Sequence, residues 1–358
     1  MPANLYKCDL PLKAPLETSH GTISVRTMWV LEITDERGRV GLGEAAPLPG
    51  FGGETPEECD RALNQALAML TSDLVSSWVE RGRPDAPLGK LETLLGRTPC
   101  ARHAVEGALL DLMAQHQGVP LAGLIAAHHA TLIPVNGLVN SLANGITEAN
   151  HLLDAGFGTV KFKLGADAED AARRLTAIRN VLGVQVQIRC DANGAWTLDQ
   201  ATAFGLAVKD ANLEYIEQPL PAADIADLAT LRRRVPVKIA VDESVRFAVD
   251  VGRIGAAQAA DVVIIKPMFL GGWRATNQAV KLAASCGLEV VITSAFDGAI
   301  GRACATHYAA ALNLTTRAQG LATGSLFVGD LVTEPLPVAA GATRINDRPG
   351  LGIGKLGG

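Results

Sequence analysis

Five short hydrophobic runs in the middle of the chain end in ionisable side chains. In sequence order, the residues at these ends are Lys161 and Lys163, Asp191, Glu217, Asp242 and Lys266. The three acids lie 26 and 25 residues apart, from 191 to 217 and from 217 to 242, as in successive strand–helix units. The strands of a parallel barrel end on a common face, where barrel enzymes build their active sites. We therefore expect these six side chains to surround one site.

The three acids predict a metal site. Asp191, Glu217 and Asp242 would place three carboxylates around one axis, and like charges at such distances raise each other's pKa. A cluster of this kind requires a cation. Oxygen ligands without His or Cys favour a hard ion, so we expect Mg²⁺, with Mn²⁺ as an alternative.

The lysines lie on either side of the acids in strand order. In an extended strand Lys161 and Lys163 point to the same face, and Lys266, four strands later, approaches from the opposite side. A lysine acts as a base when its pKa falls toward neutrality, so we expect Lys161 and the metal to lower the pKa of Lys163. The alternative is that the lysines only form ion pairs with the carboxylates.

A divalent ion between two opposed lysines suits the removal of a proton α to a carboxylate. That step creates an enediolate, whose charge a metal ion stabilises. One lysine would take the proton, and the other would return a proton or stabilise the anion. The predicted partner is therefore a small-molecule carboxylate substrate.

The runs that carry these residues belong to a longer series. From about residue 132, β-rich runs alternate with helical patterns, at 132–139, 159–164, 184–191, 213–217, 237–242, 261–266 and 288–294, with a weaker eighth run at 320–323. Strands alternating with helices imply a parallel sheet, and we predict an α/β fold, a (β/α)7β TIM-like barrel. A doubly wound open sheet is the alternative, but no glycine fingerprint follows the first run.

The N-terminal part predicts a smaller α+β capping domain. Residues 22–34 alternate apolar and polar side chains, and a turn at 35–38 leads to a second strand at 40–42. Helices are expected over Pro56–Leu70 and Pro99–Gln117, the second with one apolar face and an end at Gly118. We assign residues 1–130 to the capping domain, 131–325 to the barrel, and 326–358 to a C-terminal segment that returns to the capping domain.

Composition excludes several classes of protein. The chain has 358 residues and a formal net charge of −5 without a Lys/Arg run, which argues against nucleic-acid binding. No run of 18 apolar residues indicates a membrane span, and the N-terminus lacks the apolar stretch of a signal peptide. Six scattered cysteines indicate free thiols in a reducing cytoplasm, and the histidines lack zinc-ligand spacing. The sequence leaves the oligomeric state open, and a homo-oligomer is an alternative to a monomer because the apolar helix faces of barrels often pair.

The motif set resembles the muconate lactonizing enzyme subgroup of the enolase superfamily over nearly the whole chain, and the base-plus-Mg²⁺ chemistry above is described for enolase-superfamily sites. The motifs that carry this resemblance are Lys161-x-Lys163, Asp191-x-Asn193, Glu217-Gln218-Pro219, Asp242-Glu243-Ser244 and Lys266-Pro267, with residues 43–48 and 106–112 in the capping domain. The resemblance implies that Asp191, Glu217 and Asp242 hold Mg²⁺, with Asn193 and Glu243 as auxiliary groups. Lys163 and Lys266 become the acid/base or cation–π pair, and Lys161 tunes Lys163.

Three segments, at 47–55, 293–301 and 321–324 with Phe327, are similar to the o-succinylbenzoate synthases of that subgroup. This similarity implies a lyase that dehydrates 2-succinyl-6-hydroxy-2,4-cyclohexadiene-1-carboxylate in menaquinone synthesis. It also implies substrate contacts at Phe51, Ser294, Phe296, Asp297 and Thr323. Local packing is the alternative for the two aromatic rings, and helix capping for Asp297.

Other members of the subgroup share the same lysines. N-acylamino acid racemase, dipeptide epimerase and muconate-type cycloisomerase are therefore alternative functions, as is a non-catalytic barrel. Dipeptide epimerases carry an Asp-x-Asp pair on the eighth strand, where this chain has Leu-Ala-Thr-Gly, which argues against them. His20 and Arg26 lie near the expected capping loop, and the sequence assigns them no role.

Overall fold

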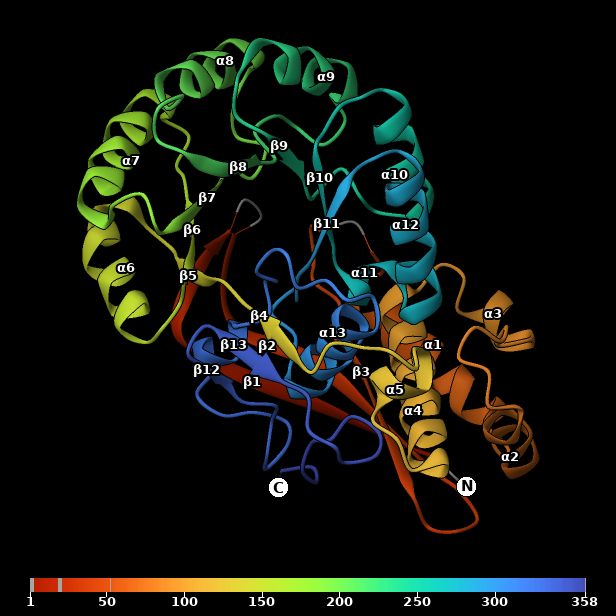
Figure 1. The fold of residues 1–358 in the computed structure, drawn as a ribbon. Coiled ribbons are helices and arrows are strands. Elements are labelled where there is room, and N and C mark those ends of the chain that lie inside the picture. Colours follow the sequence, from red (N-terminus) through yellow and green to blue (C-terminus); the bar gives the residue numbers. More distant parts are fainter. Residues whose placement is uncertain (1–2, 19–20, 52, 358) are drawn as a thin grey trace.

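A curled parallel sheet lies at the centre of the C-terminal half of the protein (Figure 1). The computed structural model describes residues 3–18, 21–51 and 53–357. The sheet runs in chain order through seven strands: β5 (Gly137–Val139), β6 (Thr159–Lys163), β7 (Gln187–Asp191), β8 (Leu213–Glu217), β9 (Ile239–Val241), β10 (Val262–Ile265) and β11 (Glu289–Ile292). Each strand is followed by at least one helix, as in a barrel of βα units.

Most of these helices form an arc around the outside of the sheet, whereas α11 (Pro267–Leu270) and α13 (Ala299–Ala311) lie against the N-terminal elements (Figure 1). The helices of the arc are α6 (Gly145–Asp154), α7 (Ala168–Leu182), α8 (Leu198–Ala207), α9 (Ile225–Arg234), α10 (Ala248–Ala256) and α12 (Trp273–Ser285). Local sequence explains several of their beginnings: Thr197 and Gln200 form a capping box at α8, and Asp167 caps α7 by accepting from the N–H of Asp170.

The barrel closes through a very short eighth segment. Gly320 forms a parallel bridge with Thr293 at the end of β11, and Gln319 forms one with Val135 just before β5. The chain then enters a 3-10 helix, η2 (Thr323–Leu326). The predicted (β/α)7β barrel is therefore confirmed. The expectation of a strand over 320–323 is wrong in extent, because only residues 319 and 320 pair.

The predicted run at 132–139 divides into two strands of different sheets. β4 (Leu132–Pro134) pairs with β13 (Ala342–Arg344), which also pairs with β12 (Val338–Ala339), and only β5 belongs to the barrel. The change of partner occurs between two successive residues. Val135 donates its N–H to Gly341 in a 2.8 Å hydrogen bond, whereas Asn136 donates to Gln319 at 3.0 Å. Successive N–H groups of an extended chain point to opposite sides, so one run serves two sheets.

The N-terminal sheet is antiparallel, with the order β1 (Ala3–Thr18), β2 (Gly21–Thr34) and β3 (Val40–Ala45). The expected strands at 22–34 and 40–42 are present in β2 and β3. The sequence does not predict β1, whose register shifts between Pro11 and Leu16, because prolines interrupt its pattern. The accompanying helices are α1 (Pro56–Met69), α2 (Ser72–Arg81), α3 (Lys90–Leu94), α4 (Pro99–Gln117) and α5 (Leu121–Ile125).

Helix α4 has the predicted bounds but not the predicted single apolar face. Fourteen of its nineteen residues are buried, so it forms the core of the N-terminal part. On one side β3 packs against it backbone to backbone, since a Cβ on Gly43 would lie 1.8 Å from the carbonyl oxygen of Ala104. The helix ends at Gly118, whose φ of 69° favours glycine. Among the described helices, none is both long and apolar enough to cross a membrane.

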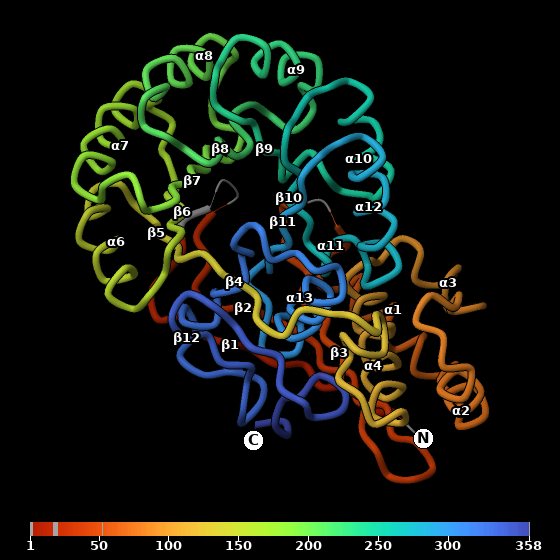
Figure 2. The backbone as a smooth tube through the Cα atoms, viewed as in Figure 1, coloured from red at the N-terminus to blue at the C-terminus, as the bar shows by residue number. Residues whose placement is uncertain are grey.

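The C-terminal chain returns to the N-terminal elements, as the blue segment in Figure 2 shows. Phe327 forms a bridge with Leu12 of β1, and Gly350 forms one with Pro120 beside α5. The division of the chain at 130/131 and 325/326 stays a prediction.

Two buried glutamates join the N-terminal elements to the barrel. The Glu44 carboxylate, on β3, accepts from the N–H groups of Gly298 at 2.6 Å and Gly301 at 2.8 Å, at the start of α13. Glu106, on α4, accepts from the N–H of Arg274 at 3.2 Å, at the start of α12. The first N–H groups of a helix lack partners within it and carry partial positive charge. Both motifs quoted from the N-terminal part thus cap barrel helices from outside.

The buried position of Glu106 predicts a pH-dependent stability. Burial raises the pKa of Glu106 from 4.5 to about 7. Because the folded value exceeds the unfolded one, this group's contribution is full below pH 4.5 and is lost as the pH rises through 7. Glu106→Gln cannot ionise, so between pH 5 and pH 8 it should lose less stability than the natural chain, by on the order of 3 kcal/mol.

Urea unfolding at the two pH values measures this difference. The exposed Glu36→Gln serves as the control and should leave the pH dependence unchanged. If Glu106→Gln and the natural chain lost the same stability between the two pH values, Glu106 would not be the titrating group.

Candidate functional site

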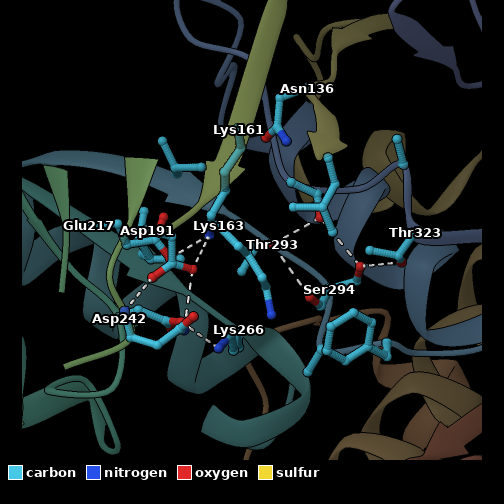
Figure 3. Close-up of a pocket in the computed structure, with 18 of the residues that line it drawn as sticks. Asn136, Lys161, Lys163, Asp191, Glu217, Asp242, Lys266, Thr293, Ser294 and Thr323 are labelled. Carbon is cyan, nitrogen blue, oxygen red and sulfur yellow. Dashed lines mark hydrogen bonds and ion pairs between the residues drawn. The ribbon is translucent and has the colours of Figure 1, made fainter. Parts of the chain in front are cut away.

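One pocket receives the six predicted side chains from the carboxyl ends of neighbouring strands (Figure 3). Lys161 and Lys163 come from β6, Asp191 ends β7, Glu217 ends β8, and Asp242 and Lys266 directly follow β9 and β10. Parallel pairing places Lys163, Asp191 and Glu217 side by side across three strands. The structure therefore brings together the residues that the spacing predicts.

Ion pairs distinguish the three lysines. Lys161 Nζ lies 2.9 Å from Asp191 Oδ2 and 2.7 Å from Glu217 Oε1, and Lys266 Nζ lies 2.6 Å from Asp242 Oδ2. Within the described part of the chain, Lys163 has no ion-pair partner. The alternative in which lysines pair with carboxylates thus describes Lys161 and Lys266, but not Lys163, which reaches into the middle of the pocket (Figure 3).

The carboxylates outnumber the charges that neutralise them. Burial raises the pKa of Glu217 to about 8, and the charges of Asp191 and Asp242 add to this effect, although Lys161 opposes it. Lys161 is shared between two acids, which leaves the group short of positive charge. In contrast, burial lowers the pKa of Lys163, and the neighbouring ammonium groups of Lys161 and Lys266 lower it further, although the charge of Asp191 opposes this shift. Lys163 is therefore the lysine of the three that loses its proton most easily.

The acid cluster fits a divalent cation. Among the residues that the structure describes, no three His, Cys, Asp or Glu side chains are arranged so that they could hold a metal ion, and the carboxylates form ion pairs with Lys161 and Lys266. Glu243 adds a buried Oε2 without a hydrogen-bond partner, and burial with the charges of Asp242 and Asp191 raises its pKa to about 7. Crowded carboxylate oxygens with excess negative charge are ligands that Mg²⁺ prefers. The ligand assignment itself stays a prediction.

Two amide side chains hold the acids in place. Asn193 donates from its backbone N–H to Asp191 Oδ1 at 2.9 Å, and from Nδ2 to Glu243 Oε1 at 3.1 Å. Gln218 accepts from the N–H of Asp242 at 2.9 Å and donates to Ser244 Oγ at 3.0 Å. Both amides follow strand ends with positive φ, 47° and 37°, a strain that surrounding contacts must hold. Sequence reasoning quotes Gln218 but does not find this role.

Aromatic rings and hydroxyls form the other walls. Phe51, Ser294, Phe296 and Thr323 all line the pocket, as predicted for substrate contacts, although contact with substrate stays a prediction. The ring centroid of Phe51 lies 4.5 Å from Lys266 Nζ, and that of Phe296 lies 5.9 Å from Lys163 Nζ. The hydroxyl oxygens of Ser294 and Thr323 are 2.7 Å apart.

Asp297 differs from the expectation, since it does not line the pocket. Phe296 has a φ of 58°, and this turn takes the next residue out of the pocket into the protein interior. There the carboxylate accepts from the N–H of Ala295 at 3.1 Å. It does not cap α13 either, whose N-cap residue is Gly298. His20 lies outside the described residues.

Several residues that line the pocket are not among the candidates named from the sequence, although four of them lie in the segments 47–55, 293–301 and 321–324. These lining residues are Leu48, Asn136, Leu138, Tyr215, Ile264, Val291, Thr293, Ala295, Gly320 and Ala322. Tyr215 and Ile264 lie two residues before Glu217 and Lys266, on the same face of their strands. The alternation of side chains along a strand could therefore have predicted that Tyr215 and Ile264 line the pocket.

Comparison with known families adds to this geometry. Residues 146–354 match the family described as enolase C-terminal domain-like. Residues 4–126 match the N-terminal domain family of mandelate racemase and muconate lactonizing enzyme.

Individual relatives have different activities. The chain is 42% identical over 209 residues to o-succinylbenzoate synthase of Thermobifida fusca (strain YX), a match that covers 57% of this chain and 63% of that enzyme, less than two thirds of its length. It is 30% identical over 351 residues to L-Ala-D/L-Glu epimerase of Bacillus subtilis (strain 168), covering 96% of this chain and 93% of the epimerase.

A solved structure shows the same fold over the whole length. The dipeptide epimerase of Enterococcus faecalis V583, crystallised with Mg and the dipeptide L-Leu-L-Tyr, superposes with a TM-score of 0.90. It is 26% identical, and the match covers 99% of each chain.

The predicted metal site can be tested without turnover. A ligand that binds only the folded chain stabilises it, by about 2.7 kcal/mol at one hundred times its Kd. Adding Mg²⁺ should therefore raise the Tm by several degrees, and Asp191→Asn should remove most of this rise. Differential scanning fluorimetry with and without Mg²⁺ measures both, and the exposed Asp199→Asn is the control. An unchanged Mg²⁺ response in Asp191→Asn would contradict the ligand assignment.

Proposed function

Because the chain belongs to the enolase superfamily, in the group of mandelate racemase and muconate lactonizing enzyme, we propose that it removes the proton α to a substrate carboxylate. One observation carries this proposal. Lys163 and Lys266 enter a single pocket from β6 and β10, with the acids of β7, β8 and β9 between them. A planar carboxylate-bearing carbon in this pocket can meet an amine from either side.

Each charged residue then has a role. Lys163, which has no ion-pair partner among the described residues, takes the α-proton. Asp191, Glu217 and Asp242 hold Mg²⁺, which when bound stabilises the negative charge that develops on the substrate carboxylate. Lys161 stays protonated between two acids, and its positive charge disfavours the protonated form of Lys163. Lys266 remains a cation and faces the opposite side of the substrate.

We propose o-succinylbenzoate synthase as the specific activity. The substrate is 2-succinyl-6-hydroxy-2,4-cyclohexadiene-1-carboxylate. Lys163 removes the proton from C1, the C6–O bond breaks, and the Lys163 ammonium gives that proton to the leaving hydroxide. Water departs, a double bond forms between C1 and C6, and the ring becomes aromatic, so atoms and charge balance.

The pocket walls support this substrate. Leu48, Phe51 and Phe296 offer an apolar surface to a hydrocarbon ring. Ala322 and Thr323 line the wall where dipeptide epimerases carry an acidic pair, so these two positions offer no carboxylate to an amino group. The 42% identity with the Thermobifida fusca synthase adds to the argument.

Racemisation of an N-acylamino acid is the second candidate. Lysines on both sides of one carbon serve proton removal and return equally well. The match to the Bacillus subtilis epimerase covers 96% of this chain, so isomerase activity remains the alternative to dehydration.

Replacing Lys163 tests the base. Lys163→Ala should lower kcat by at least about a thousandfold, within the range of general base catalysis. The Mg²⁺-dependent rise in Tm should persist, because the ammonium is not a metal ligand. Steady-state kinetics with the exposed Lys209→Ala as control gives the comparison. Undiminished turnover would remove Lys163 from the mechanism.

Paired assays test the substrate. The dehydration is followed by the absorbance of the aromatic product, and racemisation of N-succinyl amino acids by chiral chromatography in D₂O. We expect dehydration to have the higher kcat/KM. Racemisation or solvent exchange alone would overturn the synthase assignment but leave proton abstraction in place.

A further inference from the structure

A buried guanidinium joins the two segments that carry the aromatic rings of the pocket. Arg26, on β2, is 3% exposed. Its Nη2 and Nη1 donate to the carbonyl oxygens of Ala46 at 2.8 Å and Pro47 at 2.9 Å, and its Nε donates to that of Phe296 at 3.2 Å. These acceptors lie 20, 21 and 270 residues away in sequence. One side chain therefore sets the distance between two remote segments.

Each of these segments places a ring beside one of the two opposed lysines. The segment after Pro47 continues to Phe51, whose ring centroid is 4.5 Å from Lys266 Nζ. The other segment carries Phe296, whose centroid is 5.9 Å from Lys163 Nζ. The guanidinium thus connects the surroundings of both lysines, although it does not itself line the pocket.

The backbone conformation at Phe296 is strained and requires contacts from other segments to maintain it. Its φ of 58° is a left-handed conformation that costs a residue other than glycine on the order of 1–3 kcal/mol. The bond from Arg26 fastens the carbonyl of this same residue. Without it, the chain can relax, and the ring moves relative to Lys163.

Asp297 completes this arrangement. A buried guanidinium needs a compensating charge, and the carboxylate of Asp297 is the strongest charge acting on Arg26. This accounts for the side chain that the turn at Phe296 takes out of the pocket. Replacing either residue by a neutral one removes charge compensation from the other, although Glu44 also acts on Arg26 and Arg302 also acts on Asp297.

We propose that Arg26 is a positioning residue, which sets how closely Phe51 and Phe296 approach the two lysines and so selects the substrate. This inference rests on the proposed proton abstraction at Lys163 and deepens it. Arg26 lies in the segment to which the sequence assigns no role.

The chain offers a matched control in Arg179. It is likewise buried, at 5% exposure, and donates to the carbonyl oxygens of Gly183, Val186, Ala211 and Asn212 at 2.6 to 3.0 Å. None of these residues lines the pocket. Replacing either arginine removes a buried guanidinium and its hydrogen bonds. Only the replacement of Arg26 affects the segments that place aromatic rings beside Lys163 and Lys266.

The test compares Arg26→Lys and Arg26→Gln with Arg179→Lys. Lysine keeps the charge but cannot form the fork of bonds, and Gln removes the charge as well. We expect the Arg26 variants to change the ratio of kcat/KM for dehydration to that for N-succinyl amino acid racemisation by on the order of tenfold or more, mainly through KM, since small misplacements in a site have such effects. Arg179→Lys should lower the Tm without changing the ratio.

A second readout does not depend on turnover. In a Phe51→Trp background, acrylamide quenching of the new indole should increase with Arg26→Lys and stay constant with Arg179→Lys. An unchanged ratio and unchanged quenching would overturn the positioning role. If instead the protein racemises without dehydrating while the Arg26 variants alter KM and quenching, the synthase assignment fails and the positioning role stands.

Discussion

Three carboxylates carried by neighbouring parallel strands impose the constraint on which this structure depends. Pairing in register places Asp191 beside Glu217, and Asp242 follows on the next strand, so the acids are buried together at the barrel mouth. Burying like charges is unfavourable unless cations and hydrogen bonds surround them. Lys161 and Lys266 supply part of this compensation through ion pairs. The remaining excess of negative charge is what makes the mouth of the barrel suited to a divalent cation.

The same constraint explains the unusual backbone around the site. Gln218 adopts positive φ directly after the strand that ends in Glu217, and Asn193 does so two residues after the end of the strand at Asp191. Both conformations let a side-chain amide turn back and bond the acids or the backbone that carries them. The strain is local, whereas the bonds that offset it reach neighbouring strands. Phe296, after β11, has the same feature, and there the restraint comes from the N-terminal sheet.

The N-terminal elements contribute walls and restraints, and the barrel contributes the charged groups. Leu48 and Phe51 contribute apolar wall to the pocket, with the Phe51 ring beside Lys266, while Glu44 and Glu106 dock β3 and α4 on barrel helices. The contacts across this junction are buried polar bonds, which require defined geometry in a way that apolar packing does not. The charged groups and the apolar walls of the pocket therefore come from different parts of the chain.

The sequence by itself determined the barrel, the superfamily and the set of charged residues that meet in the pocket. The spacing of Asp191, Glu217 and Asp242 follows from the length of a strand–helix unit, and the bounds of α4 follow from a proline at its start and a glycine after its end. Only the tertiary structure decided where the run at 132–139 changes sheets, that Asp297 leaves the pocket, and what Arg26 and Gln218 hold. The physical reason is distance along the chain. Periodicity and capping are local patterns, whereas the carbonyl that Arg26 bonds at Phe296 lies 270 residues away, and such pairings exist only after the chain has folded.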